Sequence, residues 1–280
     1  MSQATILHWN ACTHSGSRKP RNDDSLIVFS SNHSGAETLP HDGSRSLSEE
    51  DLVFAVSDGM GGGNAGDLAS SMLLQRMSEI IPETFKAAAA GFYPDYPAHL
   101  THAIRSVHAD INGAAQDCDE KRGMAATLAL AWFTPDNLYI ANVGDSRIYR
   151  SRNGKLEQIS RDHSSAWAQW KRGEISEIQY RQHPRRSALT EVIGGGYPQV
   201  FPHFAAVDYE PGDAFLICSD GLIDGLWERH LSEALSQCGN CPAPIVETLL
   251  KRAIDNSGID DTTLIVIAVG TPSPAASQEE

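Results

Sequence analysis

Aspartates stand at the ends of several short apolar runs in this sequence, in positions where their carboxylates could share a cation. Three runs with the length and composition of buried strands end directly in an aspartate, at Asp58, Asp145 and Asp220. Two further runs begin just after paired aspartates, Asp23-Asp24 and Asp260-Asp261. In an antiparallel sheet the end of one strand lies beside the start of its neighbour. The acids are therefore predicted to gather on one edge of one β-structure.

Such an edge predicts a site for divalent cations. Unpaired carboxylates at close range raise one another's pKa, and cations relieve that repulsion. The donors would all be oxygen, with no His or Cys at these positions, which favours Mg²⁺ or Mn²⁺ over zinc or copper. A single aspartate at a strand end is more often a turn former, and Asp58-Gly59 and Asp220-Gly221 are turn signals too. The five positions together favour the metal site.

The stretch after Asp58 allows a second interpretation. Residues 61–66 satisfy the GxGxxG pattern of a dinucleotide-binding loop. That motif belongs to a parallel βαβ unit, whereas the helix predicted here is followed by a linker and another helix. Asp58 would also face a pyrophosphate with a like charge. The glycines are better explained by tight turning around a metal, with the Gly59 carbonyl as a ligand.

Bulk composition excludes several classes of protein. The chain has 280 residues and a net charge of −14, which argues against a general nucleic-acid binder. No apolar run approaches the roughly 20 residues that span a bilayer, and the N-terminus lacks the layout of a secretory signal. The five cysteines lie mostly in apolar stretches, and Cys238 and Cys241 form a lone CxxC. These features predict a cytoplasmic protein with reduced thiols.

Apolar patterns predict a mixture of strands and helices. Helical spacing marks residues 68–81, 100–118 and 244–256, and a succession of strands and turns from 125 to 159 indicates antiparallel pairing. The other strands are expected at 5–13, 25–29, 51–57, 204–209, 214–219 and 263–269. Residues 30–50 are expected to form a surface loop.

Residues 160–204 interrupt this pattern. They are polar, with short helical pieces at 166–172 and 176–182, and they predict an insertion that lies over the scaffold. Residues 271–280 are rich in Pro, Ser and Ala and predict a disordered tail. We therefore expect one domain over residues 1–270.

With these residues in view, the chain resembles the metal-dependent Ser/Thr protein phosphatases of type 2C, the PPM family, and in particular its bacterial type. The resemblance runs from about residue 13 to residue 269, with the motifs in the family's order. They are Gly16 with residues 22–24, then 58–62, 123–128, 142–147, 162–164, 189–194, 219–222 and 260–263. The resemblance implies an α+β fold of two packed antiparallel β-sheets flanked by α-helices, an α-β-β-α sandwich. Residues 160–204 would be the family's flap beside the active site.

The resemblance also implies the metal ligands. Asp58 would bridge two Mn²⁺ or Mg²⁺ ions. Asp220 and Asp260 would complete the protein ligands of one ion. Asp23 and the Gly59 carbonyl would serve the other, with waters filling the remaining positions.

Two more acids receive roles in the same way. Asp24 would hold a metal-bound water, and Asp145 with Asp220 would support a weaker third ion. A water shared by the two main ions would attack phosphorus in line while the ions neutralise charge on the phosphoryl oxygens.

The sequence departs from the family at the phosphate-binding position. The family has an arginine five residues before the second acid of its first motif, and here that position is Lys19, next to Arg18. Lysine lacks the bidentate fork of arginine, so we expect Arg18 or Lys19 to bind the phosphate. Asp261 replaces a more frequent asparagine and could compete with Asp260 as a ligand.

The flap carries further candidates for contact with phosphopeptides, although a solvated flap explains any one of them equally well. They are His163, His183, Arg185 and Arg186.

The implied function is hydrolysis of phosphoserine and phosphothreonine in proteins, in opposition to Ser/Thr kinases. Its partners would be phosphorylated proteins, among them a kinase and its substrates. The alternative is a catalytically weak relative that binds phosphoproteins as a regulator. The retained acids Asp23, Asp58, Asp220 and Asp260 argue against that alternative.

Overall fold

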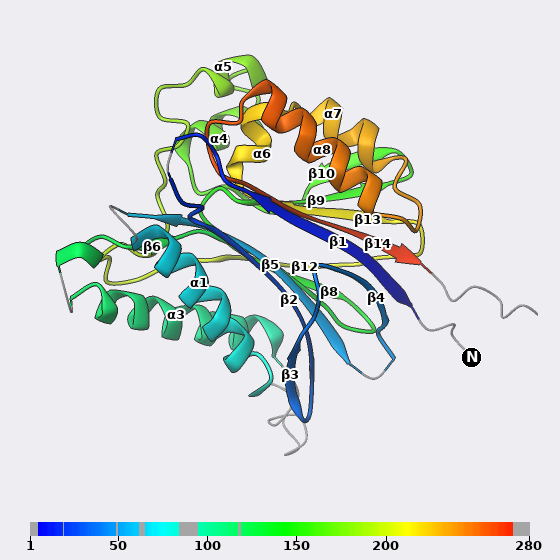
Figure 1. Ribbon diagram of the computed structural model, residues 1–280, viewed down its shortest axis with the longest axis horizontal. Helices are drawn as coiled ribbons and strands as arrows, with labels where there is room; N and C mark the ends of the chain where they lie inside the picture. Colours follow the sequence, from blue (N-terminus) through cyan, green and yellow to red (C-terminus); the bar gives the residue numbers. More distant parts are fainter. Residues whose placement is uncertain are drawn as a thin grey trace, which may run out of the picture.

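Two antiparallel β-sheets pack face to face in the computed structural model, and helices cover both outer faces (Figure 1). The structure describes residues 5–18, 20–48, 50–61, 65–83, 95–116 and 119–270. The α+β sandwich predicted from the sequence is confirmed. The predicted tail, residues 271–280, lies outside the described residues.

In the described part of the chain, one sheet has six strands in the order β10-β9-β13-β14-β1-β4. Their bounds are β10 Lys155–Gln158, β9 Arg147–Arg152, β13 Ala214–Cys218, β14 Thr262–Gly270, β1 Ile6–His14 and β4 Asp42–Ser46.

The second sheet has eight described strands, with β11-β6-β5-β7-β8-β12 in order, β2 paired with β5, and β3 paired with β2. Their bounds are β11 Ile193–Gly194, β6 Ala125–Ala126, β5 Asp51–Met60, β7 Leu128–Phe133, β8 Leu138–Val143, β12 His203–Val207, β2 Asp24–Asn32 and β3 Gly35–Thr38. Every strand pair among the described residues is antiparallel. The parallel βαβ unit of a dinucleotide site is therefore absent from this part of the chain.

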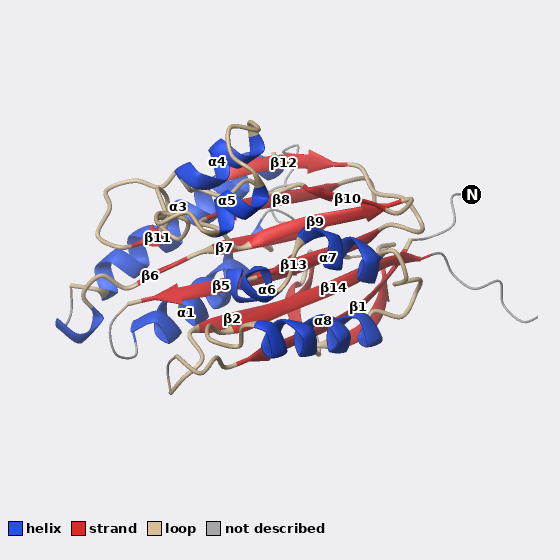
Figure 2. Cartoon of the chain, turned by 90° about the horizontal axis from the view of Figure 1, so that it is seen from above, coloured by secondary structure: helices blue, strands red, loops and turns tan. Residues whose placement is uncertain are grey.

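The helices separate into groups by the sheet that they cover, as the view from above shows (Figure 2). The eight-stranded sheet carries α1 (Ala65–Ile80) and α3 (Tyr96–Ala114). The six-stranded sheet carries α6 (Asp220–Gly225), α7 (Glu228–Leu235) and α8 (Ala243–Asn256). The flap contains α4 (Ser165–Lys171) and α5 (Glu177–Arg181), and a short 3₁₀ turn occupies Asp119–Lys121.

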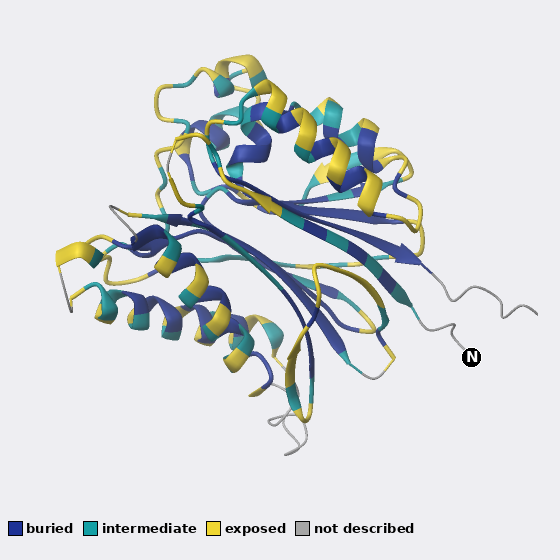
Figure 3. Ribbon diagram, viewed as in Figure 1, coloured by how far each residue is buried: buried dark blue, intermediate teal, exposed yellow. Residues whose placement is uncertain are grey.

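Strand β5 shows how the core fixes the sheets. Its side chains alternate, so that Val53 and Ala55 pack under α1 and α3 while Phe54 and Val56 enter the core between the sheets. The strand is buried on both faces, in agreement with its continuous apolar run (Figure 3). A slip of the strand by one residue would turn each of these side chains to the opposite face of the sheet and disrupt both cores. The register of β5, and with it the position of Asp58 near its end, is therefore fixed.

Residues 30–50 were expected to be a loop, and this prediction is wrong. Strand β3 pairs with β2, and β4 pairs with β1 along Ile6–Asn10. Both new strands are edge strands with exposed, polar side chains, so they lack the apolar alternation that marks a half-buried strand. The indole Nε1 of Trp9 donates to the carbonyl of Pro40 at 2.9 Å and helps to hold this segment.

Residues 160–204 do not all lie apart from the scaffold. Ile193–Gly194 pair with β6, and Ile193 and Val200 belong to the core under α3. The helices α4 and α5 lie outside the sheets and carry their own small cluster around Trp167 and Tyr180. Among the helices that the structure describes, none has the length and apolar character needed to cross a bilayer.

Candidate metal centre

The predicted acids meet at one end of the sandwich, but they come from both sheets rather than from one. Asp24 at the start of β2 and Asp58 near the end of β5 are directly opposed in the register of the eight-stranded sheet. Asp220 follows β13, and Asp260 precedes β14, in the six-stranded sheet. Asp145 lies in the turn between β8 and β9, where the chain passes from one sheet to the other.

A serine joins the two sheets at this end. The Ser219 hydroxyl donates to Oδ2 of Asp24 at 2.6 Å, and the Thr263 amide donates to the Ser219 hydroxyl at 3.0 Å. The backbone of Ser219 also extends the pairing of β13 with β14, because its amide donates to the Thr263 carbonyl at 3.0 Å. Asp24 is thus held from the opposite sheet by the residue that immediately precedes Asp220.

Asp58 is held by its backbone. Its amide donates to Thr127 Oγ1 at 2.9 Å, and the Thr127 amide donates to the Asp58 carbonyl at 2.8 Å. The Thr127 and Ser146 hydroxyls share a hydrogen bond of 2.6 Å. The turn that carries Asp145 is therefore tied to the strand that carries Asp58, and the carboxylate of Asp58 is left for other partners.

Glycines permit the close approach around Asp58. A Cβ on Gly59 would lie 2.0 Å from the carbonyl oxygen of Gly66 and 2.6 Å from that of Asp23. The Gly59 amide donates to the Asp23 carbonyl at 3.0 Å, and the Asp67 amide donates to Asp23 Oδ1 at 3.2 Å. The first turn of α1 is thus packed against both Asp23 and Gly59. Residues 62–64 of the GxGxxG stretch lie outside the described residues.

Asp260 and Asp261 occupy different environments. Asp261 is buried, with Oδ1 accepting from the Gly16 amide and Oδ2 from the Asp23 amide, both at 2.8 Å. The Asp260 side chain is 32% exposed and lies 3.6 Å from the guanidinium of Arg18. Both carboxylate oxygens of Asp261 already accept hydrogen bonds from the backbone of the segment that carries Gly16 and Asp23. The geometry therefore favours Asp260 as the ligand of the pair.

The electrostatics of the site follow from burial and like charge. Burial, followed by the charges of the neighbouring acids, raises the pKa of Asp58 and of Asp220 well above the usual range. Burial also raises the pKa of Asp24 and of Asp145 to about 7, although the Ser219 hydroxyl opposes the shift at Asp24 and Arg147 opposes it at Asp145. The protein alone therefore disfavours the ionised form of each acid.

The donor set fits hard divalent cations. Oδ1 of Asp24 is buried and has no hydrogen-bond partner among the described residues, so the protein leaves an acceptor here for a water or an ion. In the same part of the chain, no three His, Cys, Asp or Glu side chains are grouped to enclose an ion by themselves. Water would have to complete the coordination of each ion, as is usual for Mg²⁺.

Of the two predicted phosphate-binding residues, Arg18 and Lys19, the structure describes Arg18. The backbone of Arg18 is fixed because its amide donates to the Ile259 carbonyl at 2.9 Å. Its side chain is 67% exposed beside Asp260, at the rim of the acids. Lys19 lies outside the described residues.

The four flap residues predicted to contact phosphopeptides lie in different environments. His163 faces inward, with Nδ1 accepting from the Gly144 amide at 3.1 Å, and burial lowers its pKa to about 4. Arg186 forms an ion pair with Asp224 on α6. His183 Nδ1 accepts from the amide of Arg185, and Arg185 is exposed.

The CxxC pair is not brought into any site. Cys238 and Cys241 are free thiols, and burial raises the pKa of Cys238 to about 11, which disfavours the reactive thiolate.

Sequence reasoning missed the residues that hold the acids in place. They are Thr127, Ser146, Ser219 and Thr263, together with the bracing role of Asp261. Ser146, Ser219, Asp261 and Thr263 lie within motifs that contain a predicted ligand, and Thr127 lies within the 123–128 motif, so membership of a motif was the available signal. Their hydrogen bonds cross between strands, however, and depend on a pairing register that the sequence does not specify residue by residue.

Comparison with known proteins is consistent with this geometry. The family model described as protein phosphatase 2C matches residues 32–244. The serine/threonine phosphatase stp of Listeria monocytogenes is 31% identical over 215 residues, which are 77% of this chain and 83% of that protein. The S. agalactiae serine/threonine phosphatase superposes with a TM-score of 0.78 at 25% identity, over 94% of this chain and 99% of that one.

A further solved structure shares the fold. The catalytic domain of the serine/threonine protein phosphatase PstP, in complex with two manganese ions, has a TM-score of 0.73 at 24% identity, over 95% of this chain and 99% of that one. The family match covers most of the chain, and the similarity to the Listeria protein extends over a comparable length. This chain belongs to the protein phosphatase 2C family.

Proposed function

We propose that this protein hydrolyses phosphoserine and phosphothreonine in other proteins, with two Mn²⁺ or Mg²⁺ ions held by the acids at the end of the sandwich. The observation that carries the proposal is the convergence of Asp24, Asp58 and Asp220 from two sheets, with Asp24 Oδ1 buried and unpartnered among the described residues. The named activity of the relatives, and the manganese ions of the PstP domain, support it.

The ligands are assigned as follows. Asp58 would be shared by the two ions, because it lies among the acids of both sheets and its backbone is fixed by Thr127. Asp220 and Asp260 would hold one ion. Asp23 and the Gly59 carbonyl, at the packed junction of β5 and α1, would hold the other. Asp145 with Asp220 would hold a weaker third ion.

When bound, the ions lower the pKa of a shared water and neutralise negative charge on the phosphoryl group. The chain's own residues prepare this step. Ser219 fixes Oδ2 of Asp24 and so directs Oδ1 as the acceptor for a proton of the attacking water. Arg18 at the rim, or its neighbour in sequence Lys19, attracts and orients the phosphate.

The substrates are phosphoproteins, and the opposing enzymes are Ser/Thr kinases. The exposed residues around Arg18 and Arg185 suit an anionic group that arrives from solvent. A buried pocket for a small phosphorylated metabolite would require the reacting group to be enclosed, whereas Asp260 at this site is one-third exposed.

Hydrolysis of a phosphothreonine peptide and of p-nitrophenyl phosphate tests the proposal. We expect turnover with Mn²⁺ that is abolished by EDTA and by Asp58→Asn. Asp136→Asn, which changes an exposed aspartate in a distant turn, is the matched control and should keep full activity. A protein that binds the phosphopeptide but gives no turnover at any metal concentration would support the regulatory alternative instead.

A further inference from the structure

The flap grips the short helix that begins with Asp220. Arg181, the last residue of α5, donates from Nη1 to the Ile223 carbonyl at 2.7 Å and from Nη2 to the Leu226 carbonyl at 2.5 Å. These are carbonyls at the C-terminal end of α6, which have no partner within the helix. The guanidinium also lies 4.5 Å from the ring centre of Trp227.

A second arginine of the flap contacts the same helix. Arg186 forms an ion pair with Asp224, which lies one turn after Asp220 on α6. Both side chains are mostly buried, at 18% and 28% exposed. The flap therefore touches α6 at its C-terminal end and on the turn next to the metal ligand.

Helix α6 is too short to hold its own position. It spans six residues, and isolated helices of this length do not persist in water. On the side of the body, the side-chain Nδ2 of Asn256 donates to the Gly225 carbonyl at 2.9 Å, and Gly225 packs directly against Ala253 of α8. The helix is thus clamped between α8 and the arginines of the flap.

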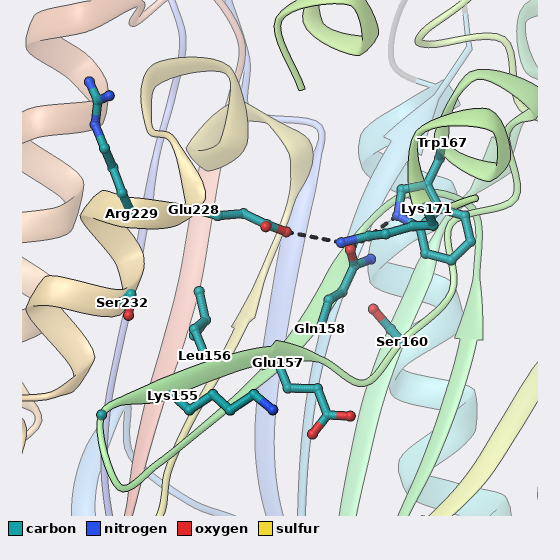
Figure 4. Close-up of a pocket in the computed structure, with 11 residues that line it drawn as sticks. Lys155, Leu156, Glu157, Gln158, Ser160, Trp167, Lys171, Glu228, Arg229 and Ser232 are labelled. Carbon is teal, nitrogen blue, oxygen red and sulfur yellow. Dashed lines mark hydrogen bonds and ion pairs between the residues drawn. The ribbon is translucent and has the colours of Figure 1, made fainter. Parts of the chain in front are cut away.

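Two other attachments of the flap, among the described residues, lie away from α6. Arg147 and Asp162 form a buried ion pair under α4. Lys171 of α4 pairs with Glu228 of α7 at 3.1 Å, and both residues line a pocket of about 700 Å³ (Figure 4). Because these contacts fasten α4, the contacts of α5 with α6 can be weakened without releasing the whole flap.

We propose that Arg181 is a positioning residue that couples the flap to the metal centre through α6. With Arg181 in place, α6 holds Asp220 at the correct depth for its ion. Movement of the flap away from the body, on binding or release of a phosphoprotein, loosens α6 and weakens the hold on that ion. The inference rests on the proposed function, because it needs Asp220 to be a metal ligand.

Calorimetric titration of Mn²⁺ into the metal-free full chain tests the coupling. We expect Arg181→Ala to weaken Mn²⁺ binding about tenfold, in the range seen when residues that support metal ligands are removed. Arg181→Lys should recover part of the affinity, because it keeps one cationic donor near the two carbonyls. At saturating Mn²⁺, kcat of Arg181→Ala should return to within about twofold of wild type.

Arg172→Ala is the matched control. Arg172 is an exposed arginine of the same flap that pairs with Glu174 two residues away, and it forms no ion pair or hydrogen bond with α6 in the part of the chain that the structure describes. Its removal should leave Mn²⁺ affinity unchanged. A folded Arg181→Ala protein that binds Mn²⁺ like wild type overturns the proposal.

Further variants keep the test decisive. If Arg181→Ala does not fold, Arg181→Lys and Asp224→Asn take its place, and wild-type Mn²⁺ affinity in both overturns the coupling. A wild-type protein that binds no Mn²⁺ contradicts the proposed function itself. The two failures are therefore distinguishable from a single set of titrations.

Discussion

Two groups of aspartates in this molecule have opposite surroundings. At the base of the flap, Asp162 accepts hydrogen bonds from Arg147 at 2.9 and 2.7 Å and from Gln158 at 2.6 Å. Arg147 in turn donates to the hydroxyls of Tyr149 and Tyr180. At the end of the sandwich, Asp24, Asp58 and Asp220 form no ion pair with any Lys, Arg or His that the structure describes.

The difference separates a structural use of carboxylates from a functional one. A buried charge that is paired and fully hydrogen-bonded is satisfied by the protein itself. Like charges gathered without such partners oppose folding, and their pKa values rise until a cation is supplied. The flap base therefore serves positioning, whereas the sandwich end is prepared for ions from solution.

Asp58→Asn should produce the largest effect at the sandwich end. Loss of the carboxylate that we propose both ions share should lower kcat/KM for p-nitrophenyl phosphate by about a thousandfold or more, which corresponds to about 4 kcal/mol of lost transition-state stabilisation. Steady-state kinetics over a range of Mn²⁺ concentrations measure it.

The same variant has an opposite effect on stability. In EDTA, Asp58→Asn should unfold at a higher urea concentration than wild type, since one of several repelling carboxylates is gone. A lower urea midpoint in EDTA would show that the acids do not repel one another in the metal-free protein.

Arg147→Met should give the largest effect at the flap base. It leaves Asp162 charged and buried without its cationic partner, with the hydrogen bond from Gln158 remaining, and we expect a loss of about 3–5 kcal/mol in the free energy of unfolding. Urea denaturation measures the loss. The double variant with Asp162→Leu removes the uncompensated charge and should recover most of it, because well-packed apolar residues often replace a buried ion pair at little cost. Without that recovery, the pair would not be the cause.

Asp51 is an intermediate case, at the other end of β5 from Asp58. It is buried, and the Trp132 indole donates to it at 2.8 Å. Burial raises its pKa from 3.8 to about 7. The folded state then binds more protons than the unfolded state between these values, so this acid lowers stability progressively as pH rises from about 4 to about 7.

Asp51→Asn removes this dependence. Relative to the variant, wild type should lose about 3 kcal/mol of unfolding free energy between pH 4 and pH 7. Urea titrations of both proteins at several pH values in EDTA measure the difference, in which the acids at the sandwich end cancel. A constant difference across the range would mean that Asp51 stays ionised.

The strands and the acids at their ends were largely predictable, because short stretches of sequence indicate them. Apolar runs that end in aspartate indicated both the strands and the acids, and antiparallel pairing brought Asp24 opposite Asp58. The contact between the two sheets was not predictable in the same way. It depends on Ser219 reaching across the sandwich to Asp24, a contact between residues 195 positions apart.

Elements with weak apolar patterns were also missed. Strands β3 and β4 expose their polar side chains. Helix α6 has only six residues, and it begins at Asp220-Gly221, a pair that is typical of turns. The distinction between Asp260 and Asp261 required their hydrogen bonds, since neighbours in sequence that point apart have no distinguishing pattern. Tertiary contacts decide such cases.

Arg18 should give the smallest effect of these variants, because it is an exposed cation beside the acids at the sandwich end. Arg18→Ala should raise KM for a phosphopeptide about threefold with kcat nearly unchanged, and the effect should shrink at high salt, as expected for an exposed charge. Arg21→Ala is the control, since Arg21 is an exposed arginine of the same loop. If Lys19 is the principal phosphate contact, Lys19→Ala will exceed Arg18→Ala in KM. Unchanged KM and kcat in both variants would remove this loop from the phosphate site and leave the metal ions as the groups that attract the substrate.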